Sequence, residues 1–258
     1  MKPPIVIIGI GELGGVFAKA FLKSGYPVYP VTRAMSMAEA ADHLSSPQLV
    51  LAAVTEKDFH PVMDNMPDPW RNHLVLLQNE LLPRDWESHG IANPSVISVW
   101  FEKKKGMDYH LLLPSPVYGP NAEVIAEALA KIDIPCKILS GEDELVFELV
   151  LKNVFVLTIN IAGLILEEGT TTSRLWEKHQ KLARDIANEV IDVQKYLTGA
   201  SFARDRLIEG FIEGVKGDPD HICKGRAAPG RLTRVVKSAD DAGLKIQTIR
   251  DIHRRLRG

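Results

Sequence analysis

The chain has 258 residues, which at about 150 residues per domain corresponds to one large or two modest domains. Hydrophobic residues make up 45% and charged residues 25% of it, which excludes a disordered, collagen-like or low-complexity chain. The net charge of -2 lacks the basic excess of a dedicated nucleic-acid binder, so we expect no nucleic-acid partner. The two cysteines, Cys136 and Cys223, cannot build a disulfide framework, and they favour a cytoplasmic location.

Short apolar runs alternate with amphipathic segments in the first half of the chain. The apolar runs predict the strands Pro4–Ile10, Val28–Val31, Leu49–Thr55, Leu74–Gln78 and Cys136–Leu139. Helical spacing predicts the helices Leu13–Ser24, Met37–Leu44 and Asn121–Lys131. Val96–Lys103 and Tyr109–Pro114 are expected to pair as strands that turn at Gly106. The alternation predicts an α/β fold with a Rossmann-type, doubly wound, mostly parallel sheet.

The second half contains no convincing strand and is expected to be all-helical. The predicted helices are Asp143–Glu168, Ser173–Leu197, Ser201–Val215, Arg231–Ala242 and one near the C-terminus. The change of pattern at Ser140-Gly141 predicts a dinucleotide-binding domain over residues 1–140. A helical substrate and dimerisation domain is expected over residues 141–258.

Neither apolar segment of the chain predicts a membrane protein. The N-terminal run is preceded by two prolines, ends in a segment with four glycines and lacks a cleavage site, so it is typical of a first core strand rather than a signal peptide. Leu149–Leu166 reaches the lower limit of a membrane span, about 17–25 residues, but it carries Lys152, Asn153 and Asn160, which are costly in lipid. We expect a buried helix whose apolar faces also support a homodimer.

The strongest local signal is a glycine-rich turn between the first predicted strand and helix. It reads Gly9, Ile10, Gly11, Glu12, Leu13 and Gly14, the spacing of a dinucleotide-binding fingerprint in its required context. Gly9 permits the tight turn, Gly11 lets the backbone approach a pyrophosphate, and Gly14 lets helix and strand pack closely. The open N–H groups of the helix start then favour the phosphates. The alternative is a purely structural glycine turn.

The end of the second predicted strand distinguishes the two nicotinamide cofactors. NAD-binding proteins place an acid there, against the ribose 2′-hydroxyl. This strand instead ends in Thr32 and Arg33, and an arginine pairs bidentately with a 2′-phosphate. The sequence therefore favours NADP(H), unless Arg33 is merely a surface residue.

Taken in order, these and later motifs resemble the ketopantoate reductase (2-dehydropantoate 2-reductase) family over nearly the whole chain. Val54-Thr55-Glu56-Lys57 is similar to its Val-Thr-x-Lys segment, in which the lysine lies near the cofactor. Leu77-Gln78-Asn79 is similar to its Gln-Asn-Gly signature, whose asparagine lies between nicotinamide and substrate. Tyr118-Gly119-Pro120 resembles its Ile-Gly-Pro segment. Lys152 falls at the position of the family's catalytic lysine, in the first long helix of the helical domain, and Asn160 falls at the second asparagine of the same helix.

The chain also departs from the family pattern. Glu80 replaces the glycine after Asn79, and Val156 occupies the first asparagine position of the long helix. The segment that holds the family's substrate-binding serine reads His221-Ile222-Cys223-Lys224-Gly225-Arg226, and its Thr-Glu pair is Thr233-Arg234. These changes put ketopantoate itself in doubt as the substrate.

The resemblance implies a reductase that transfers hydride from NADPH to a small 2-oxo acid or related carbonyl compound. Lys152 would stabilise the developing oxyanion and donate the proton, while Asn79 and Asn160 would position the nicotinamide and the substrate. Each of these residues also has an alternative role that is purely structural. Lys152 could form a helical ion pair with Glu148, Asn79 could cap a turn or helix, and Asn160 could be a buried amide with its hydrogen bonds satisfied.

Other functions remain in competition with this one. The departures also fit a degenerate reductase or redox sensor that binds NADP(H) without turnover. Arg226, Arg231 and Arg234 would suit a more anionic substrate, although solvated helix residues explain them as well. His221 and Cys223 lack the four-ligand spacing of a structural zinc site, so no metal is expected.

Overall fold

A computed structural model of the chain describes residues 2–257. Packing divides the chain into two compact units, Met1–Glu148 and Leu149–Gly258. The division falls within the long helix α6, Glu142–Gly163. The domain boundary expected at Ser140-Gly141 stays a prediction.

The first unit is built on a seven-stranded sheet with the order β2-β1-β3-β4-β5-β8-β9. All neighbouring strands are parallel except β5 and β8, which are antiparallel. The strands are β1 Ile5–Ile8, β2 Val28–Val31, β3 Leu49–Ala52, β4 Leu74–Leu76, β5 Ser95–Ile97, β8 Ser115–Tyr118 and β9 Cys136–Ile138. Pro30 is accommodated because β2 is an edge strand, where a missing N–H is tolerated.

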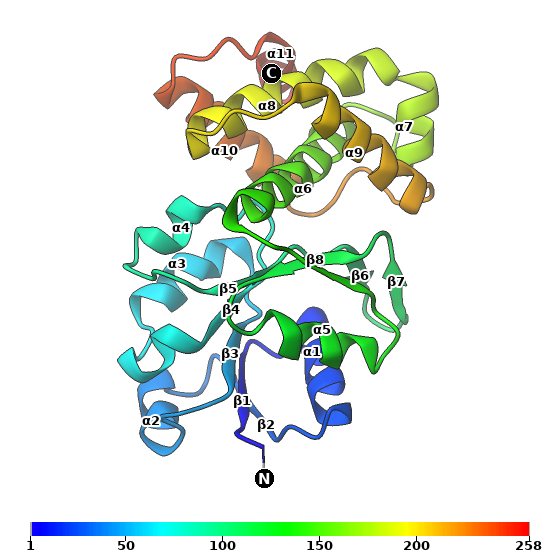
Figure 1. Cartoon of the computed structure of the whole chain (residues 1–258). Coiled ribbons are helices and arrows are strands. Elements are labelled where there is room, and N and C mark those ends of the chain that lie inside the picture. The colour runs from blue at the N-terminus through cyan, green and yellow to red at the C-terminus, as the bar shows by residue number, and fades with distance from the viewer. Residues whose placement is uncertain (1, 258) are drawn as a thin grey trace. The chain divides into compact units, whose positions relative to one another are not determined.

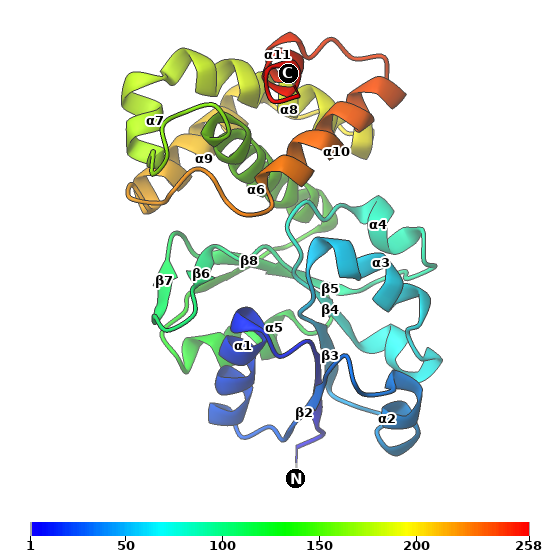
Figure 2. The same ribbon diagram turned by 180° about the vertical axis from the view of Figure 1, so that it is seen from behind.

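Helices cover both faces of this sheet, as a doubly wound fold requires. The helices α1, Glu12–Lys23, and α5, Ala122–Ala130, lie side by side on one face (Figure 1). The helices α2, Met37–His43, and α3, Glu56–Asp64, lie on the other face (Figure 2). The short helices η1, Asp68–His73, and α4, Pro83–Glu87, complete the unit. Because both faces are covered, β1 and β3 are buried along their whole lengths.

A two-stranded antiparallel hairpin lies beside α1. It consists of β6, Phe101–Lys103, and β7, Tyr109–Leu111, and Phe101 is paired with Leu111. The ring of Phe101 packs 6.1 Å from that of Phe17 on α1, measured between centroids. This contact anchors the hairpin to the helix that follows the glycine turn.

The second unit is helical, with α6 as its central helix. Asn153 of α6 donates to Gln194 of α8, and the Phe155 ring packs 5.9 Å from that of Phe211 on α9. The remaining helices are α7 Thr172–Lys178, α8 Gln180–Thr198, α9 Arg204–Gly217, α10 Ala228–Asp241 and α11 Gln247–Arg255. By length and composition α6 could cross a membrane, but 78% of its most apolar window is buried in protein. The expectation of a buried core helix is confirmed.

Several predicted elements were wrong in their bounds or were missed in the first half. The run Val96–Lys103 is not one strand: β5 joins the main sheet, and only Phe101–Lys103 pairs in the hairpin. Between them, Trp100 leaves the sheet and donates its backbone N–H to the Ser115 hydroxyl. The helices α3 and α4, the helix η1 and the strand β8 were not predicted, because prolines interrupt or flank their patterns.

The helical half also differs in detail. The helix expected to reach Glu168 ends at Gly163, where a Cβ would lie 2.7 Å from the backbone nitrogen of Lys224. The helix expected over Ser173–Leu197 is two helices, which meet at His179 with φ of -130°. Between Asp143 and Leu256 the structure has no strand, only an isolated bridge between Thr171 and Ile222.

Candidate functional site

The glycine turn is held in place by close packing at two of its three glycines. Gly9 has φ of +93°, and a Cβ there would lie 2.6 Å from the backbone oxygen of Ala53. A Cβ at Gly14 would lie 2.1 Å from the backbone oxygen of Gly9. Only glycine fits either position, so the chain can turn from β1 into α1 against the end of β3.

Gly11 differs from the other two because nothing in the protein fills the space beside it. It is the N-cap of α1 in an extended conformation, no side chain caps the helix, and a Cβ would meet no atom within 4 Å. The N–H groups of Glu12 and Leu13 open this helix without a side-chain acceptor. A diphosphate fits such a helix start, because it accepts these bonds and is attracted by the helix dipole.

Arg33 lies beyond β2, and its side chain is 85% exposed. A turn closed by a hydrogen bond from Met35 to Thr32 follows the strand. The guanidinium pairs with Asp58 at 2.9 Å, and Asp58 also accepts a hydrogen bond of 2.8 Å from the Thr55 hydroxyl. The structure thus brings Thr32, Arg33 and Thr55 to the carboxyl ends of β2 and β3.

Asp58 was missed by sequence reasoning. Its hydrogen bond from Thr55, helped by the charges of Arg33 and Lys57, holds the pKa of its carboxyl below the usual range. Thr55 is the N-cap of α3 and Lys57 is exposed on its first turn. A threonine followed three residues later by an acid is a helix-start signature, and that pattern could have revealed Asp58.

The segment after β4 is fixed by a buried glutamine. The Gln78 amide donates to the backbone oxygens of Ala52 and Val54, the latter at 3.2 Å, and so ties this segment to the end of β3. Asn79 follows, half-buried, at the sheet edge where open α/β folds bind ligands. Glu80 has φ of 64°, so this glutamate adopts the left-handed conformation that favours glycine.

Lys152 lies on α6, in the second unit, and is half-buried. Its ammonium lies 5.9 Å from the centroid of the Phe155 ring, within range of a cation–π attraction. Glu148, the carboxylate considered as its helical partner, pairs with Lys137 of β9 at 3.2 Å. The role of Lys152 stays a prediction.

Asn160 is 3% exposed, and both ends of its amide are engaged inside the second unit. Its nitrogen donates to the backbone oxygen of Cys223 at 3.0 Å, and its oxygen accepts from Arg231 at 2.7 Å. Arg231 is itself 8% exposed. This is the geometry of a satisfied buried amide that orients an arginine, and no sequence pattern indicates the pairing.

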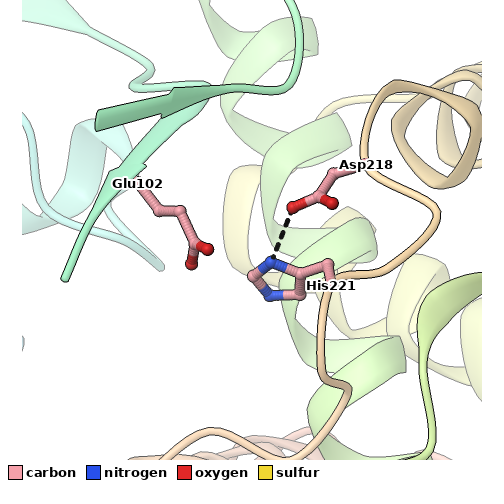
Figure 3. A group of neighbouring side chains, drawn as sticks. All are labelled: Glu102, Asp218 and His221. Atoms are coloured by element: carbon pink, nitrogen blue, oxygen red, sulfur yellow. Dashed lines mark ion pairs between the residues drawn. The ribbon is translucent and has the colours of Figure 1, made fainter. Parts of the chain in front are cut away.

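Asp218 and His221 form an ion pair at the end of α9, with Oδ2 and Nδ1 3.3 Å apart (Figure 3). The ring of His221 also packs 6.5 Å from that of Phe155. Cys223 is fully buried, and burial raises the pKa of its thiol to about 12. His221 and Cys223 thus contribute to packing and pairing inside the helical unit.

Comparison with known proteins assigns the fold. No family model matches the sequence, and no curated protein sequence matches it. Solved structures do match over nearly the whole chain. A ketopantoate reductase from Ralstonia eutropha JMP134 aligns at a TM-score of 0.69 and 16% identity, covering 100% of this chain and 97% of its own. The chain has the fold of the ketopantoate reductases.

Two further neighbours have the same architecture. A dimeric ketopantoate reductase from Staphylococcus aureus aligns at a TM-score of 0.67 and 13% identity, covering 98% of this chain and 97% of its own. A D-mandelate dehydrogenase in complex with NADH aligns at a TM-score of 0.66 and 13% identity, covering 98% of this chain and 97% of its own. The sequence resemblance is therefore confirmed at the level of fold.

Proposed function

We propose that the protein is an NADPH-dependent reductase of a small 2-oxo acid or a related carbonyl compound. The glycine turn carries the proposal. Two of its glycines are required by packing, whereas the space beside Gly11 is left open at an uncapped helix start. A turn with only a structural role needs no such opening, while a diphosphate needs it.

Arg33 and Thr32 are proposed to hold the 2′-phosphate of NADPH. No acid stands at the end of β2 to bind a ribose 2′-hydroxyl, and the Arg33 guanidinium is exposed there. Thr55 and Lys57 lie on the neighbouring helix start, so they add a hydroxyl and a second positive charge. Asp58 orients the guanidinium through one hydrogen bond, which leaves the planar group able to pair with phosphate on another edge.

Lys152 is proposed as the general acid of the reaction. When bound, NADPH supplies a hydride from C4 of its nicotinamide ring to the carbonyl carbon. The Lys152 ammonium would stabilise the negative charge that develops on the carbonyl oxygen and then donate a proton to it. Asn79 would hold the nicotinamide at the sheet edge. Asn160 would act through Arg231, which its amide oxygen orients.

The first test is a fluorescence titration of the purified protein with NADPH and, separately, with NADH. Tight NADPH binding with weak NADH binding is expected. Arg33→Ala should raise the Kd of NADPH about tenfold and leave that of NADH unchanged, because one charge-assisted phosphate contact is lost. Equal binding of the two cofactors would contradict the role of Arg33.

The second test follows NADPH oxidation across a panel of 2-oxo acids that includes ketopantoate. Lys152→Ala should lower kcat by about 10²–10⁴-fold without changing the Kd of NADPH. Lys178→Ala, which removes an exposed lysine of α7, serves as the control and should match the wild type. Full turnover by Lys152→Ala would refute the mechanism.

A cofactor-binding protein without turnover is the second candidate. Two observations favour it. The Asn160 amide is already hydrogen-bonded to Cys223 and Arg231, and Val156 stands where the family has its first asparagine. This candidate predicts NADPH binding with no oxidation across the panel. Turnover of any panel member would eliminate it.

We also propose a cytoplasmic homodimer. Both cysteines are free thiols, as expected in a reducing compartment, and one structural neighbour is described as dimeric. The apolar faces of α6 do not carry this proposal, because they form the core of its own unit. A monomer mass in light scattering at micromolar concentration would refute the dimer.

A further inference from the structure

A cavity of about 280 Å³ lies between the start of α1 and the β6–β7 hairpin, entirely within the first unit. It adjoins the face of the glycine turn that the protein leaves open, and both acidic and basic side chains line it. Its lining residues are Ile10, Gly11, Glu12, Gly15, Val16, Lys19, Lys103, Asp108 and Tyr109. The hairpin therefore forms one wall of a space that starts at the proposed diphosphate site.

Lys103 holds a positive charge at a fixed place on this wall. Its ammonium donates to the backbone oxygens of Lys104, at 3.0 Å, and of Met107. The same ammonium lies 3.4 Å from a carboxylate oxygen of Glu12, and the Lys103 side chain is 21% exposed. Two backbone acceptors on its own hairpin keep the ammonium in position even when Glu12 moves.

Glu12 is the first residue of α1, where its carboxylate occupies the end of the helix that attracts anions. Its side chain is 44% exposed, so water can replace Lys103 as the partner of the carboxylate. A diphosphate at the N–H groups of the turn would carry more negative charge than the carboxylate and would compete with it for Lys103.

We propose that Lys103 binds the diphosphate of the cofactor and that Glu12 is its counter-ion until the cofactor arrives. The inference rests on the proposed function, which it deepens by adding the hairpin to the cofactor site. On binding, the Lys103 ammonium exchanges the Glu12 carboxylate for a phosphate oxygen, while its bonds to the hairpin carbonyls persist. Lys19, four residues beyond Gly15 on α1, supplies a second positive charge to the same cavity.

The exchange predicts opposite effects for the two partners. Lys103→Met should raise the Kd of NADPH about tenfold, since a charge-assisted hydrogen bond to phosphate is lost. Glu12→Gln should lower that Kd, because the competing carboxylate and its repulsion are removed. In the Lys103→Met background the gain from Glu12→Gln should be smaller than in the wild type, because no ammonium is left for the carboxylate to compete for and only its repulsion of the diphosphate is removed.

The test measures the Kd of NADPH by fluorescence for the wild type, Lys103→Met, Lys103→Arg, Glu12→Gln and the double variant. Lys105→Met is the matched control, since it removes an exposed lysine of the same hairpin that does not line the cavity. Adenosine 2′-monophosphate, which carries the 2′-phosphate but no diphosphate, is titrated by competition. Melting curves verify that each variant is folded, and Lys103→Arg keeps the charge should Lys103→Met fail to fold.

The expected result is a tenfold weaker binding of NADPH by Lys103→Met, with adenosine 2′-monophosphate unaffected and Lys105→Met equal to the wild type. Lys103→Arg should stay close to the wild type. If the wild type binds NADPH and the Kd of Lys103→Met lies within twofold of the wild-type value, the inference is overturned. The proposed function would then remain intact. A wild type that binds no NADPH overturns the proposed function and this inference with it.

Discussion

Replacing Gly11 with alanine separates the proposed ligand-binding role of the glycine turn from its structural role. Gly11 has φ of -81° and ψ of -164°, extended backbone that alanine adopts, and its Cβ would meet no protein atom within 4 Å. Relative to glycine, alanine should stabilise the folded protein by about 0.4–1 kcal/mol, because it lowers the conformational entropy of the unfolded chain. Alanine is also a poorer N-cap than glycine, which should cost a similar amount, about 0.5–1 kcal/mol. The free energy of unfolding should therefore change by less than about 1 kcal/mol.

Cofactor binding by Gly11→Ala should fail although the fold persists. The methyl group would occupy the space through which a diphosphate reaches the N–H groups of α1. Losing that approach should raise the Kd of NADPH at least about a hundredfold, equivalent to ~2.7 kcal/mol. Fluorescence titration measures the affinity, and urea unfolding of the same preparation measures the stability.

Gly14→Ala is the matched control for this experiment. Its Cβ would lie 2.1 Å from the backbone oxygen of Gly9, which cannot move without displacing the turn. We expect a loss of about 1–3 kcal/mol of stability or more, as for other overpacked sites. A Gly11→Ala protein that binds NADPH like the wild type would refute the assignment of the turn. A Gly14→Ala protein as stable as the wild type would refute the packing argument.

Three further predictions concern single sites. Glu80→Gly should be more stable than Glu80→Ala by about 1 kcal/mol, because both lack the carboxylate and only alanine has the left-handed cost of about 1–2 kcal/mol, which exceeds glycine's entropy penalty of about 0.5–1 kcal/mol. Calorimetry should show a melting temperature about 2–4 °C higher for Glu80→Gly than for Glu80→Ala, and equal values would contradict the backbone argument. Asn160→Ala should destabilise by about 1–3 kcal/mol in urea unfolding, since Arg231 loses one buried hydrogen-bond acceptor. Unchanged stability would contradict that role. Burial raises the pKa of the Cys136 and Cys223 thiols to about 12, so both stay protonated at pH 8. Thiol reagents should label them slowly in the native protein and rapidly in denaturant, and rapid native labelling would contradict this.

The strand–turn–helix at the N-terminus was predictable because its signals are local. An unbroken apolar run, glycines at fixed spacing and an amphipathic helix lie within 23 residues, and β1 and α1 form there. Val28–Val31 was predicted with its observed bounds for the same reason. Short apolar runs between turn signals are typical of strands buried on both faces, so the fold class also followed from the pattern.

Element boundaries were less predictable where one apolar run contains two separate elements. The residues of β5 and β6 are similarly apolar, so the pattern gave no sign that the chain leaves the sheet between them. The hydrogen bond of Trp100 to Ser115, which marks the departure, joins residues 15 positions apart. Similarly, α6 ends at Gly163, where Cys223 and Lys224 pack too closely for a Cβ, a contact that periodicity does not encode.

By itself the sequence determined the fold class, the glycine turn and the candidates Arg33 and Lys152, since each depends on residue type and local spacing. Only the tertiary structure decided what these residues contact. Asp58 holds Arg33, Gln78 ties two strand ends together, and the Asn160 amide bonds Arg231, which lies 71 residues away. Such pairings depend on how helices and strands pack, because a polar group finds its partner in space rather than along the chain.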